Sequence, residues 1–144
     1  MATKDIGIGV IGVGMGANVL PINLDPTSRL QVRAVCGQNA ARAQRLADQW
    51  QLPFWTTDYR KVIERPDIDV VAVYSPDQLH IEHASAALRA GKHVICTKPM
   101  CTTVEDAATL VELADQSGLT FLVGQTMRFD PEFAGAKRFF DDGE

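Results

Sequence analysis

The sequence predicts an α/β fold, a Rossmann-type doubly wound parallel sheet of six strands with flanking helices. Two observations lead to this prediction. Apolar segments rich in β-branched residues alternate with segments of helical spacing from Ile6 to Val123, and chains that return repeatedly to a parallel sheet are built this way. The first apolar segment, residues 6–11, also runs directly into a glycine-rich turn that opens a helix. This order is typical of dinucleotide-binding domains.

The glycine-rich turn is the first candidate site. Gly12 can turn tightly out of the strand, and Gly14 has no side chain to keep a pyrophosphate away from the backbone. Ala17 is small enough to let the next helix lie close to the strand. The free N–H groups of that helix would face the phosphates. An ordinary glycine-rich turn is the alternative. The predicted cofactor-binding residues here are Gly12, Gly14, Met15, Gly16 and Ala17.

The composition indicates a globular chain, long enough at 144 residues for one domain with a core. Hydrophobic residues make up 46% and charged residues 22%, and the net charge of -4 offers no basic surface for nucleic acid. Apolar runs are too short for a membrane span, and the acidic residue near the N-terminus argues against a signal peptide. Three cysteines without metal-ligand spacing favour reduced thiols in a cytoplasmic protein.

The expected strands cover residues 6–11, 30–36, 54–56, 69–74, 93–96 and 119–123. The expected helices cover residues 15–24, 40–50, 59–65 and 79–90, a segment ending near residue 118, and residues 131–141. Pro21 is expected to kink or shorten the first helix, and Asp58 to cap the third. Gly91 is expected to close the fourth helix. Thr102 and Glu105 predict a capping box for the fifth.

Three stretches resemble signatures of the Gfo/Idh/MocA oxidoreductases, a family named after glucose–fructose oxidoreductase and inositol dehydrogenase. Residues 91–100, Gly-Lys-His-Val-Ile-Cys-Thr-Lys-Pro-Met, are similar to Gly-Lys-His-Val-…-Glu-Lys-Pro-Leu. Residues 75–80, Ser-Pro-Asp-Gln-Leu-His, are similar to Thr-Pro-Asn-x-x-His, and residues 124–129 resemble Gly-x-x-x-Arg-Phe. The chain departs from these patterns at Thr97, where the family usually has Glu, and at Asp77, where it usually has Asn.

The resemblance implies the cofactor-binding half of an NAD(P)-dependent oxidoreductase. Such an enzyme transfers hydride to or from a secondary alcohol of a sugar, cyclitol or related polyol. Two alternatives remain: an NAD-dependent glycosidase of the same family, and a non-catalytic nucleotide-binding or regulatory module. The alternation of strands and helices ends near Gly124, so residues 1–124 are expected to form the Rossmann domain. Family members are more than twice as long, and residues 125–144 are expected to be the start of an incomplete second domain. The 144-residue chain alone is expected to be inactive, and the full-length form to be a homo-oligomer.

Lys98 is the expected catalytic residue. A lysine before proline at the carboxyl end of a strand lies where open α/β sheets bind ligands, and the resemblance implies that Lys98 contacts the substrate hydroxyl. A solvated surface lysine is the alternative. No metal site is expected, because His80 and His83 lack a third ligand, and His83 is expected to be a partly buried packing residue. The resemblance adds further cofactor-binding residues, which are Ser75, Pro76, His80, Thr97 and Lys98.

The end of the second strand predicts a preference for NADP over NAD. An NAD-selective site usually places Asp or Glu about 20 residues past the glycine motif, but residues 36–39 read Cys-Gly-Gln-Asn. Gly37 leaves room for a 2′-phosphate, while Gln38 and Asn39 can donate hydrogen bonds. Arg42 or Arg45 could pair with that phosphate. The alternative is that both arginines are solvated and the site takes either cofactor.

Overall fold

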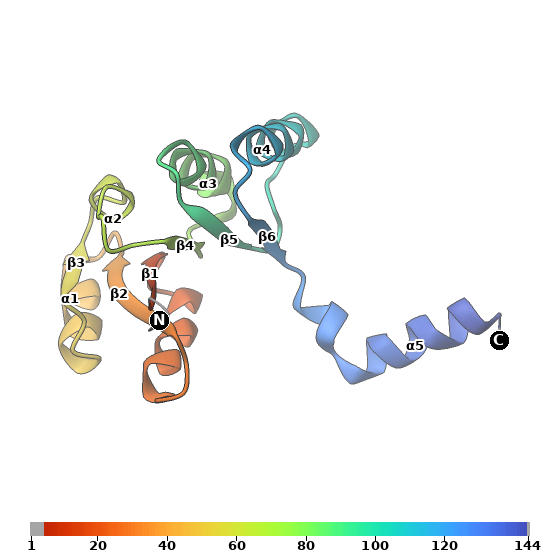
Figure 1. Ribbon diagram of the computed structural model, residues 1–144, viewed down its shortest axis with the longest axis horizontal. Helices are drawn as coiled ribbons and strands as arrows, with labels where there is room; N and C mark the ends of the chain where they lie inside the picture. Colours follow the sequence, from red (N-terminus) through yellow and green to blue (C-terminus); the bar gives the residue numbers. More distant parts are fainter. Residues whose placement is uncertain (1–4, 144) are drawn as a thin grey trace, which may run out of the picture.

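The computed structural model describes residues 5–143, and its centre is a six-stranded parallel sheet (Figure 1). The strands are β1 (Ile6–Ile11), β2 (Leu30–Cys36), β3 (Phe54–Thr56), β4 (Val70–Val73), β5 (His93–Thr97) and β6 (Phe121–Gly124). They pair in the order β3-β2-β1-β4-β5-β6. The direction of winding reverses between β1 and β4, which is where doubly wound sheets open a crevice for ligands. The predicted fold class is therefore confirmed.

Helices cover both faces of the sheet. The α-helices are α1 (Ala40–Gln49), α2 (Arg60–Ile63), α3 (His80–Arg89), α4 (Val104–Ser117) and α5 (Pro131–Asp142). On one face, Leu20 and Ala43 pack with Val10 in one buried cluster. On the other face, Ala84 of α3 and Leu110 of α4 belong to a second cluster, and α3 and α4 lie over β5 and β6 in Figure 1. The two clusters fix the sheet between its helical layers.

One expected helix differs in type, and two expected helix starts need correction. The segment Met15–Leu24 is a 3-10 helix rather than an α-helix, and it contains Pro21, whose nitrogen cannot donate a hydrogen bond. The helix expected from residue 79 is preceded by a 3-10 turn, Asp77–Leu79, so that α3 begins at His80. The predicted capping box at Thr102 is wrong by one residue. The hydroxyl of Thr103 accepts the hydrogen bond that caps α4, at 3.1 Å from the amide nitrogen of Asp106.

Two predicted helix ends are confirmed. The Asp58 carboxylate accepts a hydrogen bond of 3.1 Å from the amide of Arg60 at the start of α2. Gly91 has a φ of 76° just after α3, a backbone conformation that favours glycine. These two turns set the positions at which the chain leaves β3 and enters β5.

Lys92 and His93 of the Gly-Lys-His stretch make hydrogen bonds that stabilise the fold, at the edge of the sheet opposite the crevice. Lys92 donates hydrogen bonds from Nζ to the carbonyl oxygens of Arg65 and Ile68, at 2.9 and 2.8 Å. His93 Nδ1 accepts a 3.0 Å hydrogen bond from the amide of Thr120. Both residues lie at the amino end of β5, so they tie the loops before β4 and β6 to the sheet.

The chain leaves the sheet after β6. A 3-10 helix, Thr126–Phe129, leads into α5, which extends away from the sheet in Figure 1. Phe133, Phe139 and Phe140 on α5 are 50, 61 and 81% exposed. This helix therefore carries exposed apolar side chains. Among the residues that the structure describes, no helix combines the length and apolar character that crossing a bilayer requires.

Candidate cofactor site

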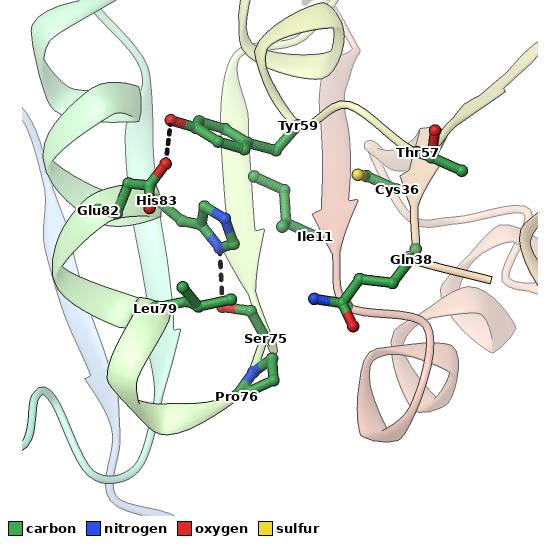
Figure 2. A pocket seen from close by; sticks show the side chains of 12 residues that line it. Ile11, Cys36, Gln38, Thr57, Tyr59, Ser75, Pro76, Leu79, Glu82 and His83 are labelled. Atoms are coloured by element: carbon green, nitrogen blue, oxygen red, sulfur yellow. Dashed lines mark hydrogen bonds between the residues drawn. The ribbon is translucent and has the colours of Figure 1, made fainter. Parts of the chain in front are cut away.

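A cavity of about 240 Å³ lies at the carboxyl ends of β1, β2 and β4 (Figure 2). The loops after β1 and β2 form one side of it, and the loop after β4 together with α3 forms the other. Five of the predicted cofactor residues line this cavity: Gly12, Gly37, Gln38, Ser75 and Pro76. The structure thus brings together three separate stretches of sequence at the point where the strand order reverses.

The glycine turn has the shape that a close backbone approach requires. Gly12 has a φ of 103°, and a Cβ added there would lie 2.2 Å from the carbonyl oxygen of Tyr74. A Cβ at Gly14 would meet nothing within 4 Å. The space in front of Gly14 is therefore free for a ligand, whereas position 12 requires glycine because of its φ and its contact with Tyr74.

The next two positions of the turn hold the 3-10 helix against the strand. Met15 begins that helix and Gly16 is buried within it. A Cβ at Gly16 would lie 2.7 Å from Cγ1 of Val10. Gly16 therefore has the close-packing role expected of Ala17, which packs partly buried against the same core.

The segment after β2 combines a packing residue with polar side chains. A Cβ at Gly37 would lie 2.4 Å from Val13, so glycine is required here for packing as well as for space. Gln38 points its amide toward the cavity in Figure 2. Asn39 caps α1, because its side-chain oxygen accepts a 2.9 Å hydrogen bond from the amide of Arg42. Arg42 is exposed on the first turn of α1.

The opposite wall consists of side chains on α3 and the loop after β3. Ser75 Oγ lies 2.8 Å from Nδ1 of His83, and the Tyr59 hydroxyl donates a 2.8 Å hydrogen bond to Glu82 (Figure 2). The rings of Tyr59 and His83 are 4.3 Å apart between centroids. Burial lowers the pKa of His83 below its usual value, and burial followed by the Glu82 hydrogen bond raises the pKa of Tyr59. Both rings are therefore neutral near pH 7.

The segment after β5 lies at the same edge of the sheet but outside the cavity. Thr97 ends β5, and Lys98 follows it as an exposed side chain. The peptide bond between Lys98 and Pro99 is cis. Exposure at the carboxyl end of a central strand leaves Lys98 accessible to a ligand that extends from the cavity along the crevice.

His80 has a different environment from the one predicted. Its ring is completely buried, with Nδ1 2.7 Å from the carbonyl oxygen of Pro99 and Nε2 2.9 Å from that of Ser75. A direct contact between His80 and a cofactor is therefore not supported, because the ring has no accessible surface. His83 is buried as expected, but it also lines the cavity.

Comparison with known proteins decides the family. The sequence profile of the Gfo/Idh/MocA oxidoreductases, described as an oxidoreductase family with an NAD-binding Rossmann fold, matches residues 6–125. The chain belongs to this family. Inositol 2-dehydrogenase 2 of Saccharopolyspora erythraea is 36% identical over 140 residues, which cover 96% of this chain and 41% of that protein. The scyllo-inositol 2-dehydrogenase (NADP(+)) of Bacillus subtilis is 29% identical over 140 residues, with 96% and 38% covered.

Solved structures of similar proteins share the fold. The scyllo-inositol dehydrogenase of Lactobacillus casei, solved with bound NAD(H) and scyllo-inositol, has a TM-score of 0.85 and 27% sequence identity. The match covers 97% of this chain and 42% of that one. The chain thus spans about two fifths of the length of the relatives it matches.

The site fits the nicotinamide dinucleotides named for this family. The open backbone at Gly14 can accept a pyrophosphate, and the Gln38 side of the cavity holds no carboxylate that would repel a phosphate. Among residues 5–143, no group of three or more His, Cys, Asp and Glu side chains could hold a metal ion. Burial raises the pKa of Cys36 to about 11 and that of Cys96 to about 12, so neither thiol ionises readily as a nucleophile.

Sequence reasoning missed half of the cavity wall in this family member. Tyr59 and Glu82 meet only because α2 and α3 lie side by side on one face of the sheet. A weak signal existed, since Tyr59 follows closely after the carboxyl end of β3, the edge where ligands bind. Glu82 has no corresponding signal, because it lies inside a helix.

Proposed function

We propose that this chain is the cofactor-binding domain of an NADP- or NAD-dependent dehydrogenase that acts on a secondary alcohol of a cyclitol, sugar or related polyol. The observation that carries the proposal is the cavity at the reversal of strand order, placed beside an open glycine turn. Inositol is the substrate named for the Saccharopolyspora relative, and scyllo-inositol is bound in the Lactobacillus structure. These names support the polyol class.

The described residues divide the crevice into two parts. The backbone of the glycine turn, from Gly12 to Ala17, would hold the pyrophosphate, with the first amides of the 3-10 helix directed at its oxygens. The cavity beside it would hold the adenosine half. Leu79 and the Tyr59 ring offer an apolar surface to a flat base, and the Gln38 amide offers polar atoms to the ribose.

Lys98 would act at the other end of the crevice. The bound nicotinamide supplies hydride transfer in such enzymes. In the reduction direction, the exposed ammonium of Lys98 would donate a proton to the substrate oxygen as it becomes the hydroxyl, and the amine left behind would accept that proton again in the oxidation direction. Thr97, at the last position of β5, would border the nicotinamide, because its backbone lies at the same sheet edge as Ser75.

We further propose that NADP is preferred over NAD. Residues 36–39 contain no carboxylate, and Arg42 is exposed one turn into α1, beside the segment where a 2′-phosphate would lie. A relative named for NADP(+) and another solved with NAD(H) indicate that both cofactors occur among similar proteins. Residues 125–144 are proposed to begin the substrate domain, and hydride transfer is proposed to need that domain for positioning.

Binding of NADPH by the chain tests the proposed function, with nicotinamide fluorescence as the readout. The Gly14→Val variant is expected to lose at least about tenfold in affinity, because its side chain would occupy the space meant for the pyrophosphate. Gly135→Val is the matched control, since a Cβ at Gly135 on α5 also meets nothing within 4 Å. Equal affinities for the unaltered chain and Gly14→Val would overturn the proposed position of the pyrophosphate.

A further inference from the structure

His80 makes two contacts that the proposed mechanism does not use. It is the first residue of α3 and is completely buried. Nδ1 lies 2.7 Å from the carbonyl oxygen of Pro99, and Nε2 lies 2.9 Å from the carbonyl oxygen of Ser75. The imidazole therefore connects the segment after β5 with the loop after β4.

Both partners of His80 can only accept hydrogen bonds. A neutral imidazole carries one N–H, whereas an imidazolium carries two. With a single hydrogen, the other ring nitrogen would direct its lone pair at a carbonyl oxygen within hydrogen-bond distance, and that oxygen would lose its hydrogen bond from the ring. Two hydrogens satisfy both oxygens, and hydrogen bonds from a charged donor are about twice as strong as neutral ones.

The surroundings of the ring include effects of both signs. Burial and the amino end of α3 oppose a positive charge, while the first turns of the preceding 3-10 helix and of α3 contribute the negative charges of Asp77 and Glu82. The two hydrogen bonds favour the charged form. The titratable and charged groups on α3 and the turn before it, on β5 and the segment after it, and on α4 are Asp77, Glu82, His83, Arg89, His93, Cys96, Lys98, Cys101, Glu105, Asp106, Glu112 and Asp115.

We propose that His80 is a positioning residue that carries hydrogen on both ring nitrogens and ties the Lys98–Pro99 segment to the border of the cofactor cavity. Pro99 is bonded covalently to Lys98, so holding its carbonyl fixes the backbone from which the Lys98 side chain extends. The importance of this His80–Pro99 contact for catalysis rests on the proposed function, in which Lys98 contacts the substrate. The tie itself is a property of the chain alone.

Ser75 contacts both His80 and His83, so the hydrogen bonds of the two rings can be compared within one structure. His80 bonds to its carbonyl oxygen, and His83 Nδ1 lies 2.8 Å from its hydroxyl. A hydroxyl can donate or accept, so a single ring hydrogen is enough for His83. His83 is on the same helix and has a similar degree of burial, but it does not contact the segment after β5 by any of these bonds.

The first test is the hydrogen count on each ring in the 144-residue chain, measured at pH 7 by NMR with ¹⁵N-labelled histidine. Both ring nitrogens of His80 are expected to carry hydrogen, and only one nitrogen of His83. A ring nitrogen of His80 without hydrogen would overturn the proposal. No ligand and no variant is needed, so the result is independent of cofactor binding and of folding defects.

The second test compares His80→Phe with His83→Phe. In His80→Phe the amide signals of Thr97, Lys98 and Met100 are expected to shift and exchange faster, and affinity for NADPH is expected to fall about tenfold. Affinity for a 2′-phosphorylated ADP-ribose, which lacks the nicotinamide ring, should change by less than about twofold. His83→Phe should weaken both ligands alike, because His83 lines the adenosine cavity.

Two results of this comparison count against the proposal. Equal losses of both ligands in His80→Phe, or unchanged amide signals at residues 97–100, would make His80 a general packing residue. If the unaltered chain binds neither ligand, the proposed function fails, and the ring-nitrogen and amide measurements still decide the role of His80.

Discussion

Ser75 and His83 are joined at the wall of the cofactor cavity, with the serine Oγ 2.8 Å from the histidine Nδ1. This contact links the loop after β4 to the second turn of α3. Burial, the larger of several effects, lowers the pKa of His83 below 6.5. The folded state therefore holds His83 neutral more strongly than the unfolded chain does.

The pH dependence of stability follows from this lowered pKa. Below pH 6.5 the unfolded chain binds a proton at His83 before the folded state does, so the free energy of unfolding should fall as the pH drops through that window. Urea unfolding at pH 7.5 and 5.5 should show a smaller difference for His83→Gln than for the unaltered chain. Asp25 and Asp67 have a carboxyl pKa below its ordinary value of 3.8, so their protonation affects the free energy of unfolding at a pH below this window. An unchanged difference in His83→Gln would contradict this assignment.

Gly12→Ala is expected to destabilise the fold by at least about 2 kcal/mol. The substitution combines a φ of 103° with a Cβ that would lie 2.2 Å from the carbonyl oxygen of Tyr74, an atom that cannot move without shifting β4. Gly135→Ala is the control, since Gly135 lies within α5 and a Cβ there would meet nothing within 4 Å. Urea unfolding should therefore separate the two variants. Similar stabilities would show that the turn relaxes more easily than its geometry indicates.

Cofactor preference should depend on Arg42. The unaltered chain is expected to bind NADPH more tightly than NADH, and Arg42→Ala should weaken NADPH about tenfold while leaving NADH unchanged, because only NADPH has a phosphate for the guanidinium. Arg138→Ala is the matched control, because Arg138 is also exposed but lies on α5 and does not line the cofactor cavity. Fluorescence titration with both cofactors measures the effect. An NADH affinity equal to or tighter than that for NADPH would reject the preference.

The exposed phenylalanines of α5 are expected to drive self-association. Phe133 and Phe140 are seven residues apart, so they lie on one side of the helix, and they are 50 and 81% exposed. Sedimentation velocity at increasing concentration should show a dimer for the unaltered chain and less of it for the double variant Phe133→Ser, Phe140→Ser. Val104→Ser on α4 is the control, because Val104 is 80% exposed elsewhere. A strictly monomeric profile of the unaltered chain would count against the expectation.

The sheet and the glycine turn could be predicted because their signals are local. Apolar runs rich in β-branched residues, such as residues 70–73, indicate a strand without knowledge of the segments that pack against them. Gly12 and Gly14 follow directly in the chain from β1. The capping box missed by one residue because Thr102 and Thr103 are chemically equivalent, and only the backbone conformation decides which one accepts the hydrogen bond.

The remainder of the site depends on packing between distant segments. The contact between Tyr59 and Glu82 joins residues 23 positions apart, and that between His80 and Pro99 joins residues 19 apart. No periodicity predicts these pairs. The same limit applies to Lys92, whose ammonium bonds to two carbonyl oxygens at the opposite edge of the sheet.

The position of Gln38 and Arg42 has a practical consequence for redesign. Both residues belong to one short segment, 38–42, which Asn39 closes by capping α1. The Tyr59–His83 wall comes from other parts of the chain and shares no hydrogen bond with this segment among those described above. We therefore expect cofactor preference to be changed by replacing the other four residues of segment 38–42, with Asn39 retained to cap α1 and the rest of the pocket left as it is.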